Sequence, residues 1–125
     1  MQDEFNELFI KKDDLNKELL KEILLPNIRL LDDGTIIFQN LSIQQNKKIV
    51  IYLLGNKIFN IREIKKNDAE TPTIISKNTG IPLGTVKRSV RELVDLGIIK
   101  QNEKGEYFVP NFNLSKVKEW IKSEE

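Results

Sequence analysis

Residues 71–97 constrain the fold of this chain most, because two helical segments are separated there by a turn of only a few residues. Thr71 can cap the first segment, and Pro72 suits the first helical position, where its missing N–H costs nothing. Gly80 can end this segment after about two turns. The Ile-Pro pair that follows cannot simply continue the helix, so a second helix is predicted from Leu83 to Leu96. Two helices joined by so short a turn must cross steeply.

The second helix is predicted to bury one face against the first. Small Ser76 allows the two helices to approach closely, while Ile75 and Ile81 supply further core contacts. The apolar residues of the second helix recur at helical spacing and form a predicted buried stripe of Val86, Val90, Leu93 and Val94.

A β-hairpin is predicted to follow the second helix. Residues 98–101 and 106–109 are strand-like, and Asn-Glu-Lys-Gly separates them, with Gly105 free to take a positive φ. The order of helix, turn, helix and hairpin over residues 71–109 resembles a winged helix-turn-helix domain, and residues 71–99 are similar to the helix-turn-helix of small archaeal regulators. Residues 47–62 are compatible with the first helix of that family.

The resemblance implies binding to double-stranded DNA, commonly by dimeric regulators. Winged helices also serve as protein-interaction modules, so the fold alone does not settle the function.

The charge distribution favours DNA binding independently of the resemblance. Residues 71–91 contain four basic side chains and no Asp or Glu, which is what a surface close to phosphates requires. Residues 1–41 hold five Lys or Arg against nine Asp or Glu, a net charge of −4, whereas the remaining 84 residues carry +5. Solvation of an ordinary globular surface is the alternative explanation for such an excess.

Helical geometry assigns roles to the candidate DNA-binding residues, which lie on or beside the face opposite the stripe. Thr85 and Arg88 are predicted to read bases in the major groove, Arg88 through a bidentate contact with guanine. Phosphate contacts are predicted for Lys77, Lys87 and Arg91. At the hairpin, Lys104 at the tip and Lys100 in the first strand would meet the DNA backbone or the minor groove.

Residues 1–41 are predicted to form an acidic appendage of one helix, between Asp14 and Pro26, and one hairpin over residues 27–38. The apolar stripe of this helix either packs on the winged region or forms a dimer surface. Two alternatives also apply to the extreme N-terminus, which either frays or docks on a partner through its apolar side chains: Phe5, Leu8 and Phe9.

Residues 42–110 are assigned to the winged helix-turn-helix domain. A capping box at Ser42 and Gln45 is predicted to open its first helix, which continues as one bent helix or two collinear pieces past Gly55. Residues 111–125 form a C-terminal amphipathic helix, capped by Asn113 or Ser115. Its apolar residues either close the core or pair across a two-fold axis, which makes them dimerisation candidates: Leu114, Val117, Trp120 and Ile121.

The fold class is therefore mainly α with small β-hairpins (α+β). The chain has no Cys and no His, which removes disulfides, thiolate metal sites and the commonest general base. We expect no enzyme activity, no cofactor and no metal site. No apolar stretch is long enough to span a membrane, and the acidic N-terminus is unlike a signal peptide, so a cytoplasmic protein is predicted.

Sequence-specific binding of double-stranded DNA by a homodimeric transcription regulator is the predicted function. The alternative is a winged-helix adaptor for protein partners in a transcription, replication or segregation complex. The acidic segment 1–41 would supply its contact surface.

Overall fold

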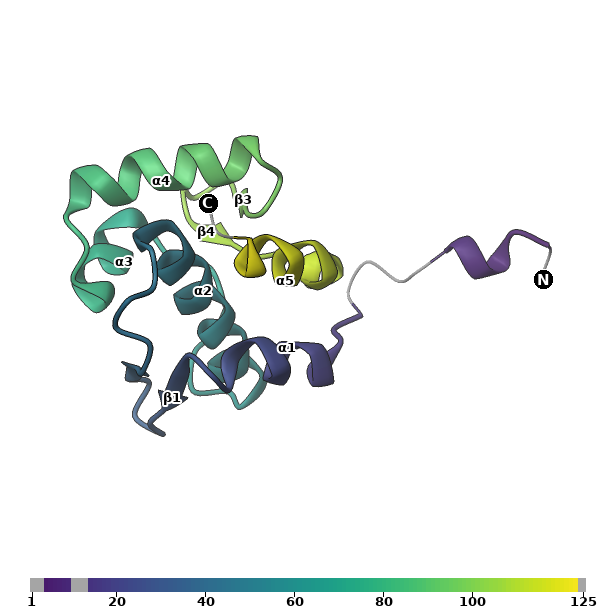
Figure 1. The fold of residues 1–125 in the computed structure, drawn as a ribbon, viewed down its shortest axis with the longest axis horizontal. Coiled ribbons are helices and arrows are strands. Elements are labelled where there is room, and N and C mark those ends of the chain that lie inside the picture. The colour runs from purple at the N-terminus through teal and green to yellow at the C-terminus, as the bar shows by residue number, and fades with distance from the viewer. Residues whose placement is uncertain (1–3, 10–13, 124–125) are drawn as a thin grey trace.

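The computed structural model describes residues 4–9 and 14–123 (Figure 1). Residues 1–3 and 10–13 of the predicted appendage and residues 124–125 of the predicted C-terminal helix lie outside the described residues. In chain order the elements are η1 (Asn6–Leu8), α1 (Lys17–Leu24), β1 (Ile28–Leu30), β2 (Ile36–Phe38), α2 (Gln45–Ile61), α3 (Pro72–Thr79), α4 (Leu83–Asp95), β3 (Lys100–Gln101), β4 (Tyr107–Phe108), η2 (Asn111–Asn113) and α5 (Leu114–Lys122). The chain is thus mainly helical with two small antiparallel hairpins, as predicted.

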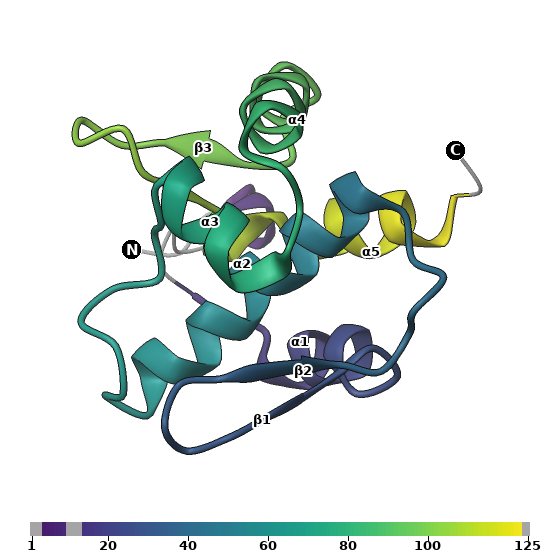
Figure 2. The ribbon, with the colours of Figure 1, turned by 90° about the vertical axis from the view of Figure 1, so that its left-hand side faces the viewer.

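Helix α2 lies at the centre of the fold. Its apolar run from Ile49 to Leu54 is buried on every side, as expected for a helix without a solvent-facing stripe. Helices α3 and α4 cover one side of α2, and α1 with the β1–β2 hairpin covers the other (Figure 2). One hydrophobic core cluster accordingly includes residues of α1, β1, α2, α3, α4, β4 and α5.

The N-terminal helix and hairpin pack on this core. Helix α1 buries Leu20, Ile23 and Leu24 against α2 and α5, so its apolar stripe is covered within the chain. In the hairpin, Leu30 pairs with Ile36. A Cβ added at Gly55 in α2 would lie 2.7 Å from Ile36 Cδ1, so a larger residue there would require the Ile36 side chain to shift.

An ion pair joins α1 to α5. Lys118 Nζ lies 2.7 Å from Glu22 Oε1, and this hydrogen bond with its charge lowers the pKa of the Glu22 carboxyl. The contribution of the pair to stability is therefore present above the ordinary glutamate pKa of 4.5 and is lost as the pH falls through the lowered value. Both side chains keep some solvent contact, so this contribution is small.

The predicted capping box at the start of α2 is wrong. The helix begins at Gln45 with Gln44 as the preceding residue, and Ser42 belongs to a different local structure. Asn40 Oδ1 accepts hydrogen bonds from the Ser42 amide at 3.3 Å and from the Ser42 hydroxyl at 3.0 Å. An Asx-type turn has taken the place of the cap. The helix then continues unbroken through Gly55.

The C-terminal helix forms as predicted, but it begins without the expected side-chain cap. Asn113 precedes the helix without capping it, and its side-chain Nδ2 donates to the carbonyl oxygens of Gly97 at 2.7 Å and Ile98 at 3.1 Å. Among the four dimerisation candidates, Leu114 and Val117 are buried in the core, whereas Trp120 and Ile121 are only partly buried.

Candidate nucleic-acid interface

Helix α3 has the boundaries that its terminal residues predict. Thr71 Oγ1 accepts a hydrogen bond from the Ile74 amide at 3.4 Å, and Pro72 occupies the first turn. Gly80 ends the helix in the left-handed conformation, with φ 78°.

Two hydroxyl groups fix the turn that follows. Ser76 Oγ donates to the Ile81 carbonyl oxygen at 2.6 Å. Thr79 Oγ1 donates to the Ile75 carbonyl oxygen at 2.7 Å and accepts from the Ile81 amide at 3.3 Å. Ile75 and Ile81 are buried beneath the turn. Hydrogen bonds and apolar packing therefore both fix the angle between α3 and α4. Ser76 thus donates a hydrogen bond in addition to allowing the two helices to approach closely through its small size.

Helix α4 lies at the outer edge of the fold (Figures 1 and 2). It buries Val86, Val90 and Leu93, with Ser89 completing the covered face. The prediction that Val94 is buried is wrong, since 37% of this side chain is exposed. Only α3 and α2 cover α4 extensively, and this covering is too narrow to include Val94.

The opposite face of α4 carries the predicted basic residues. Lys87, Arg88 and Arg91 are exposed, Thr85 is half-buried at the edge, and Lys77 is exposed on α3. Among the described residues, the ion pairs involve other lysines, so none of these four basic side chains belongs to an ion pair. A surface of this kind can attract phosphate groups.

Acidic residues limit the length of this basic surface. Glu92 and Asp95 are exposed and follow Arg88 and Arg91 by one helical turn each. Acidic side chains repel DNA phosphates, so the cationic surface of α4 ends at Arg91 and includes the N-terminal half of the helix. This half is the part of a recognition helix that reaches base edges in the usual docking.

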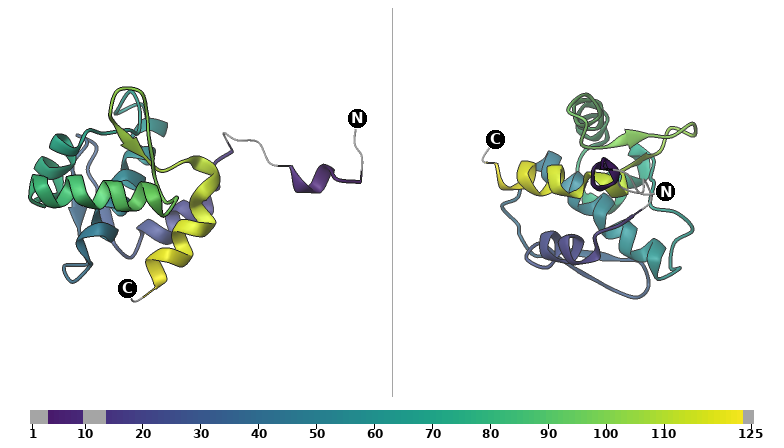
Figure 3. Two further views of the ribbon diagram at one scale, coloured as in Figure 1. Left: turned by 90° about the horizontal axis from the view of Figure 1, so that it is seen from above. Right: turned by 90° about the vertical axis from the view of Figure 1, so that its right-hand side faces the viewer.

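The β3–β4 hairpin forms the predicted wing, and both α4 and the wing lie on the same side of the molecule (Figures 2 and 3). An additional strand-like pairing was not predicted. The Tyr107 amide donates to the Glu70 carbonyl oxygen at 2.7 Å, and the Glu70 amide donates back at 3.0 Å. The wing is thereby anchored to the segment that enters α3.

The tip of the wing is organised by Asn102. Its Oδ1 accepts from the amides of Lys104 and Glu106, both at 3.0 Å, and its Nδ2 donates to Glu106 Oε1 at 2.9 Å. The Glu106 carboxylate is thus drawn back from the tip, where Lys104 and Glu103 stay exposed. Lys100 is differently placed, with its ammonium 5.4 Å from the centre of the Phe112 ring.

A polar network beneath the interface was missed by sequence reasoning. Asn78 Nδ2 on α3 donates to the hydroxyl of buried Tyr52 at 2.8 Å. Lys65 Nζ lies 2.7 Å from Asn56 Oδ1 and 3.0 Å from Glu70 Oε1. The network therefore ties α2 to α3 and to the anchor of the wing. Its one signal in the sequence is Asn56, a polar residue that comes soon after the apolar run of α2.

Residues 61–100 match the family described as winged helix-turn-helix DNA-binding. The chain contains a winged helix-turn-helix DNA-binding domain. The match begins at the last residue of α2 and ends at the first residue of β3, so it covers α3, the turn and α4. Comparison with curated proteins and with solved structures gives no match.

The match includes five of the six basic residues predicted to contact DNA, as well as Thr85. These matched candidates are Lys77, Lys87, Arg88, Arg91 and, at the last matched position, Lys100, whereas Lys104 lies beyond the match. In the part of the chain that the structure describes, no helix is both long and apolar enough to cross a membrane.

Proposed function

We propose that the winged helix domain binds specific sequences of double-stranded DNA, with the N-terminal half of α4 in the major groove. The observation that carries the proposal is the outward face of α4, where Lys87, Arg88 and Arg91 are exposed without an ion-pair partner among the described residues. Arg88 and Thr85 are the proposed base readers. Lys77, Lys87 and Arg91 are the proposed phosphate contacts, with Lys104 meeting the backbone beside the wing.

A homodimeric transcription regulator is the role that this proposal favours. Two copies would present two α4 helices to two half-sites, which raises both affinity and specificity. Such a regulator would act in the cytoplasm, where it meets genomic DNA. Neither a cofactor nor catalysis enters the proposed role.

Single alanine substitutions distinguish reading from positioning. Arg88→Ala should weaken binding to a selected site more than binding to random duplex, because a bidentate base contact contributes about 1–3 kcal/mol of discrimination. Lys77→Ala should weaken both alike and reduce the salt slope by about one. Fluorescence anisotropy with a selected duplex and a random duplex, at two salt concentrations, measures both effects.

Lys122→Ala on α5 is the matched control, because it removes one exposed cation from another surface and should change neither affinity nor slope. If Arg88→Ala weakens binding to all sequences equally, Arg88 is not a base reader.

Gly84 gives a second test of the same interface. It lies on the exposed face of α4 one turn before Arg88, and apart from its chain neighbours and the backbone of its own helix, no protein atom lies within 4 Å of the position that a Cβ would take. Nothing in the fold requires glycine there, although glycine costs a helix about 1 kcal/mol relative to alanine. A close approach of DNA to the α4 backbone would explain its presence.

Gly84→Ala should therefore stabilise the protein by about 0.5–1 kcal/mol and yet bind DNA less tightly. An added methyl group in a tight contact costs about 1–3 kcal/mol, so the affinity should fall by about tenfold or more. Thermal unfolding and anisotropy on the same sample report the two effects separately. Higher stability with unchanged affinity would show that DNA does not approach Gly84.

A protein-interaction adaptor is the second candidate function, favoured by the acidic N-terminal segment. Leu8 and Phe9 in that segment are 78% and 77% exposed. An adaptor should retain its protein partner after substitution of Lys87, Arg88 and Arg91, whereas a DNA-binding regulator should lose its duplex.

A further inference from the structure

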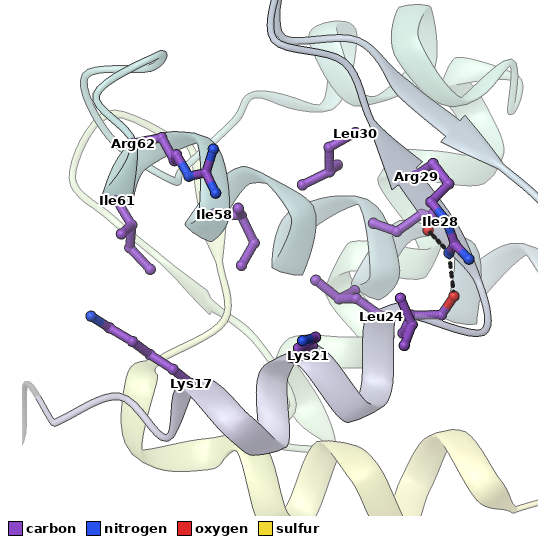
Figure 4. Close-up of a pocket in the computed structure, with 10 residues that line it drawn as sticks. Lys17, Lys21, Leu24, Ile28, Arg29, Leu30, Ile58, Ile61 and Arg62 are labelled. Carbon is purple, nitrogen blue, oxygen red and sulfur yellow. Dashed lines mark hydrogen bonds between the residues drawn. The ribbon is translucent and has the colours of Figure 1, made fainter.

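On the side of the fold away from α4 lie α1 and β1 (Figure 2). An open groove lies between them and the C-terminal end of α2 (Figure 4). Its volume is about 400 Å³, within the range of sites that bind small molecules or side chains. The apolar lining consists of Leu24, Leu25, Ile28, Leu30, Ile58 and Ile61. Leu25 and Ile61 are 51% and 44% exposed at its edges, so the chain leaves an apolar surface uncovered there.

All charged side chains that line the groove are basic. Lys17 and Lys21 extend from α1, and Arg62 extends from the end of α2 on the facing side (Figure 4). The guanidinium of the fourth, Arg29, donates to the carbonyl oxygens of Leu25 and Ile28, which fixes it at one end. Lys17, Lys21 and Arg62 form no ion pair with other described residues. An occupant should therefore combine apolar groups with several carboxylates.

The N-terminal segment of the chain has this chemistry. Leu8 and Phe9, within and directly after η1, are more than three-quarters exposed, and Glu4 and Glu7 place carboxylates beside them. Residues 4–9 lie clear of the rest of the fold (Figures 1 and 3). An apolar segment with acidic residues and an apolar groove with basic residues thus occur in one chain, and they do not meet within one copy.

We infer that residues 4–9 of one copy dock in this groove of a second copy, and that the exchange is reciprocal. Leu8 and Phe9 would cover the aliphatic floor, while Glu4 and Glu7 would face Lys17, Lys21 and Arg62. Reciprocal exchange produces a closed two-fold dimer in which both apolar surfaces are buried. The seven residues 10–16 can span up to about 24 Å, which is enough to reach a neighbouring copy.

This inference deepens the proposed homodimer and does not depend on DNA binding. The groove and α4 lie on opposite sides of the fold, so dimer formation can be measured without DNA and DNA binding without the dimer. Failure of one proposal is thereby distinguishable from failure of the other.

Sedimentation velocity of the full chain, from micromolar to submillimolar concentration and without DNA, tests the exchange. The wild-type protein should form a dimer. Leu8→Ser with Phe9→Ser should raise the dimer Kd by at least about tenfold, because large apolar contacts dominate such interfaces. Ile61→Glu should do the same from the groove side. Leu41→Glu is the matched control, since Leu41 is 90% exposed outside the groove and should leave the dimer intact.

Mixing the two defective variants gives the sharpest result. The Ile61→Glu copy has an intact segment and the Leu8→Ser, Phe9→Ser copy has an intact groove, so the mixture should form a heterodimer through one docking site. Should Ile61→Glu unfold, Lys17→Glu with Lys21→Glu replaces it, because both lysines are exposed. A monomeric wild-type protein, a dimer that persists in both variants through a contact such as Trp120, or a mixture that stays monomeric would each overturn the inference.

Discussion

Alanine at Lys87, Arg88 and Arg91 together is expected to reduce the affinity for a selected duplex by roughly 100- to 1,000-fold. Each phosphate contact contributes close to tenfold at moderate salt through counterion release, and the loss of a base contact adds about 1–3 kcal/mol. The three side chains are exposed, so their removal should leave the melting temperature unchanged. The salt slope should also fall by about two to three, because fewer counterions are displaced on binding.

Anisotropy of a labelled duplex at two salt concentrations measures this loss. A control with alanine at Lys116, Lys118 and Lys122 removes the same formal charge from α5 and should keep nearly full affinity. If both triple variants lose affinity equally, the attraction comes from overall charge and α4 is not the DNA-binding helix. A folded wild-type protein that binds no duplex would favour the adaptor function.

Asp68→Ala is expected to lower the free energy of unfolding by about 3 kcal/mol, because it leaves a buried ammonium without its counter-charge. Lys57 is 3% exposed, and its Nζ lies 2.8 Å from Asp68 Oδ2 and 2.5 Å from Asn111 Oδ1. The asparagine oxygen can accept a hydrogen bond but cannot neutralise the charge. For a chain of this size the loss corresponds to a decrease in melting temperature of about 10 °C.

Thermal and urea unfolding measure the effect, and two variants serve as controls. Glu22→Ala breaks an ion pair with a mostly exposed carboxylate and should change stability little. Lys57→Met combined with Asp68→Ala removes both charges and should recover much of the loss, since a buried pair can often be replaced by apolar groups. Equal unfolding curves for Asp68→Ala and wild type would show that water solvates Lys57 in place of Asp68.

The helix-turn-helix was predictable because its boundaries depend on local chemistry. Thr71, Pro72 and Gly80 each favour one backbone conformation through their own side chain or its absence, so their effect can be inferred without knowing the rest of the fold. The same is true of Gly105 in the wing, which has φ 77°. The exposed positions of Lys87, Arg88 and Arg91 followed from helical periodicity, whereas their contacts with DNA stay a prediction.

The errors and omissions concern features that depend on distant parts of the chain. Whether Val94 is covered depends on how far α2 and α3 extend beside α4, which periodicity does not specify. The capping box at Ser42 failed because Asn40 offered a competing acceptor. The network of Tyr52, Lys65, Glu70 and Asn78 joins α2, the loop that follows it and α3, so no spacing in the sequence reveals it.

The burial of α2 on every side also limits how this protein can change. A helix with one solvent-facing side can be transferred to another protein together with its own sequence, because only one surface must be matched. Here the residues that support α3 and α4 and the residues that receive α1 and the first hairpin belong to the same few turns of α2. The helix-turn-helix therefore cannot be moved to another protein without α1 and the first hairpin. A substitution on one side of α2 must also preserve the packing on its other side.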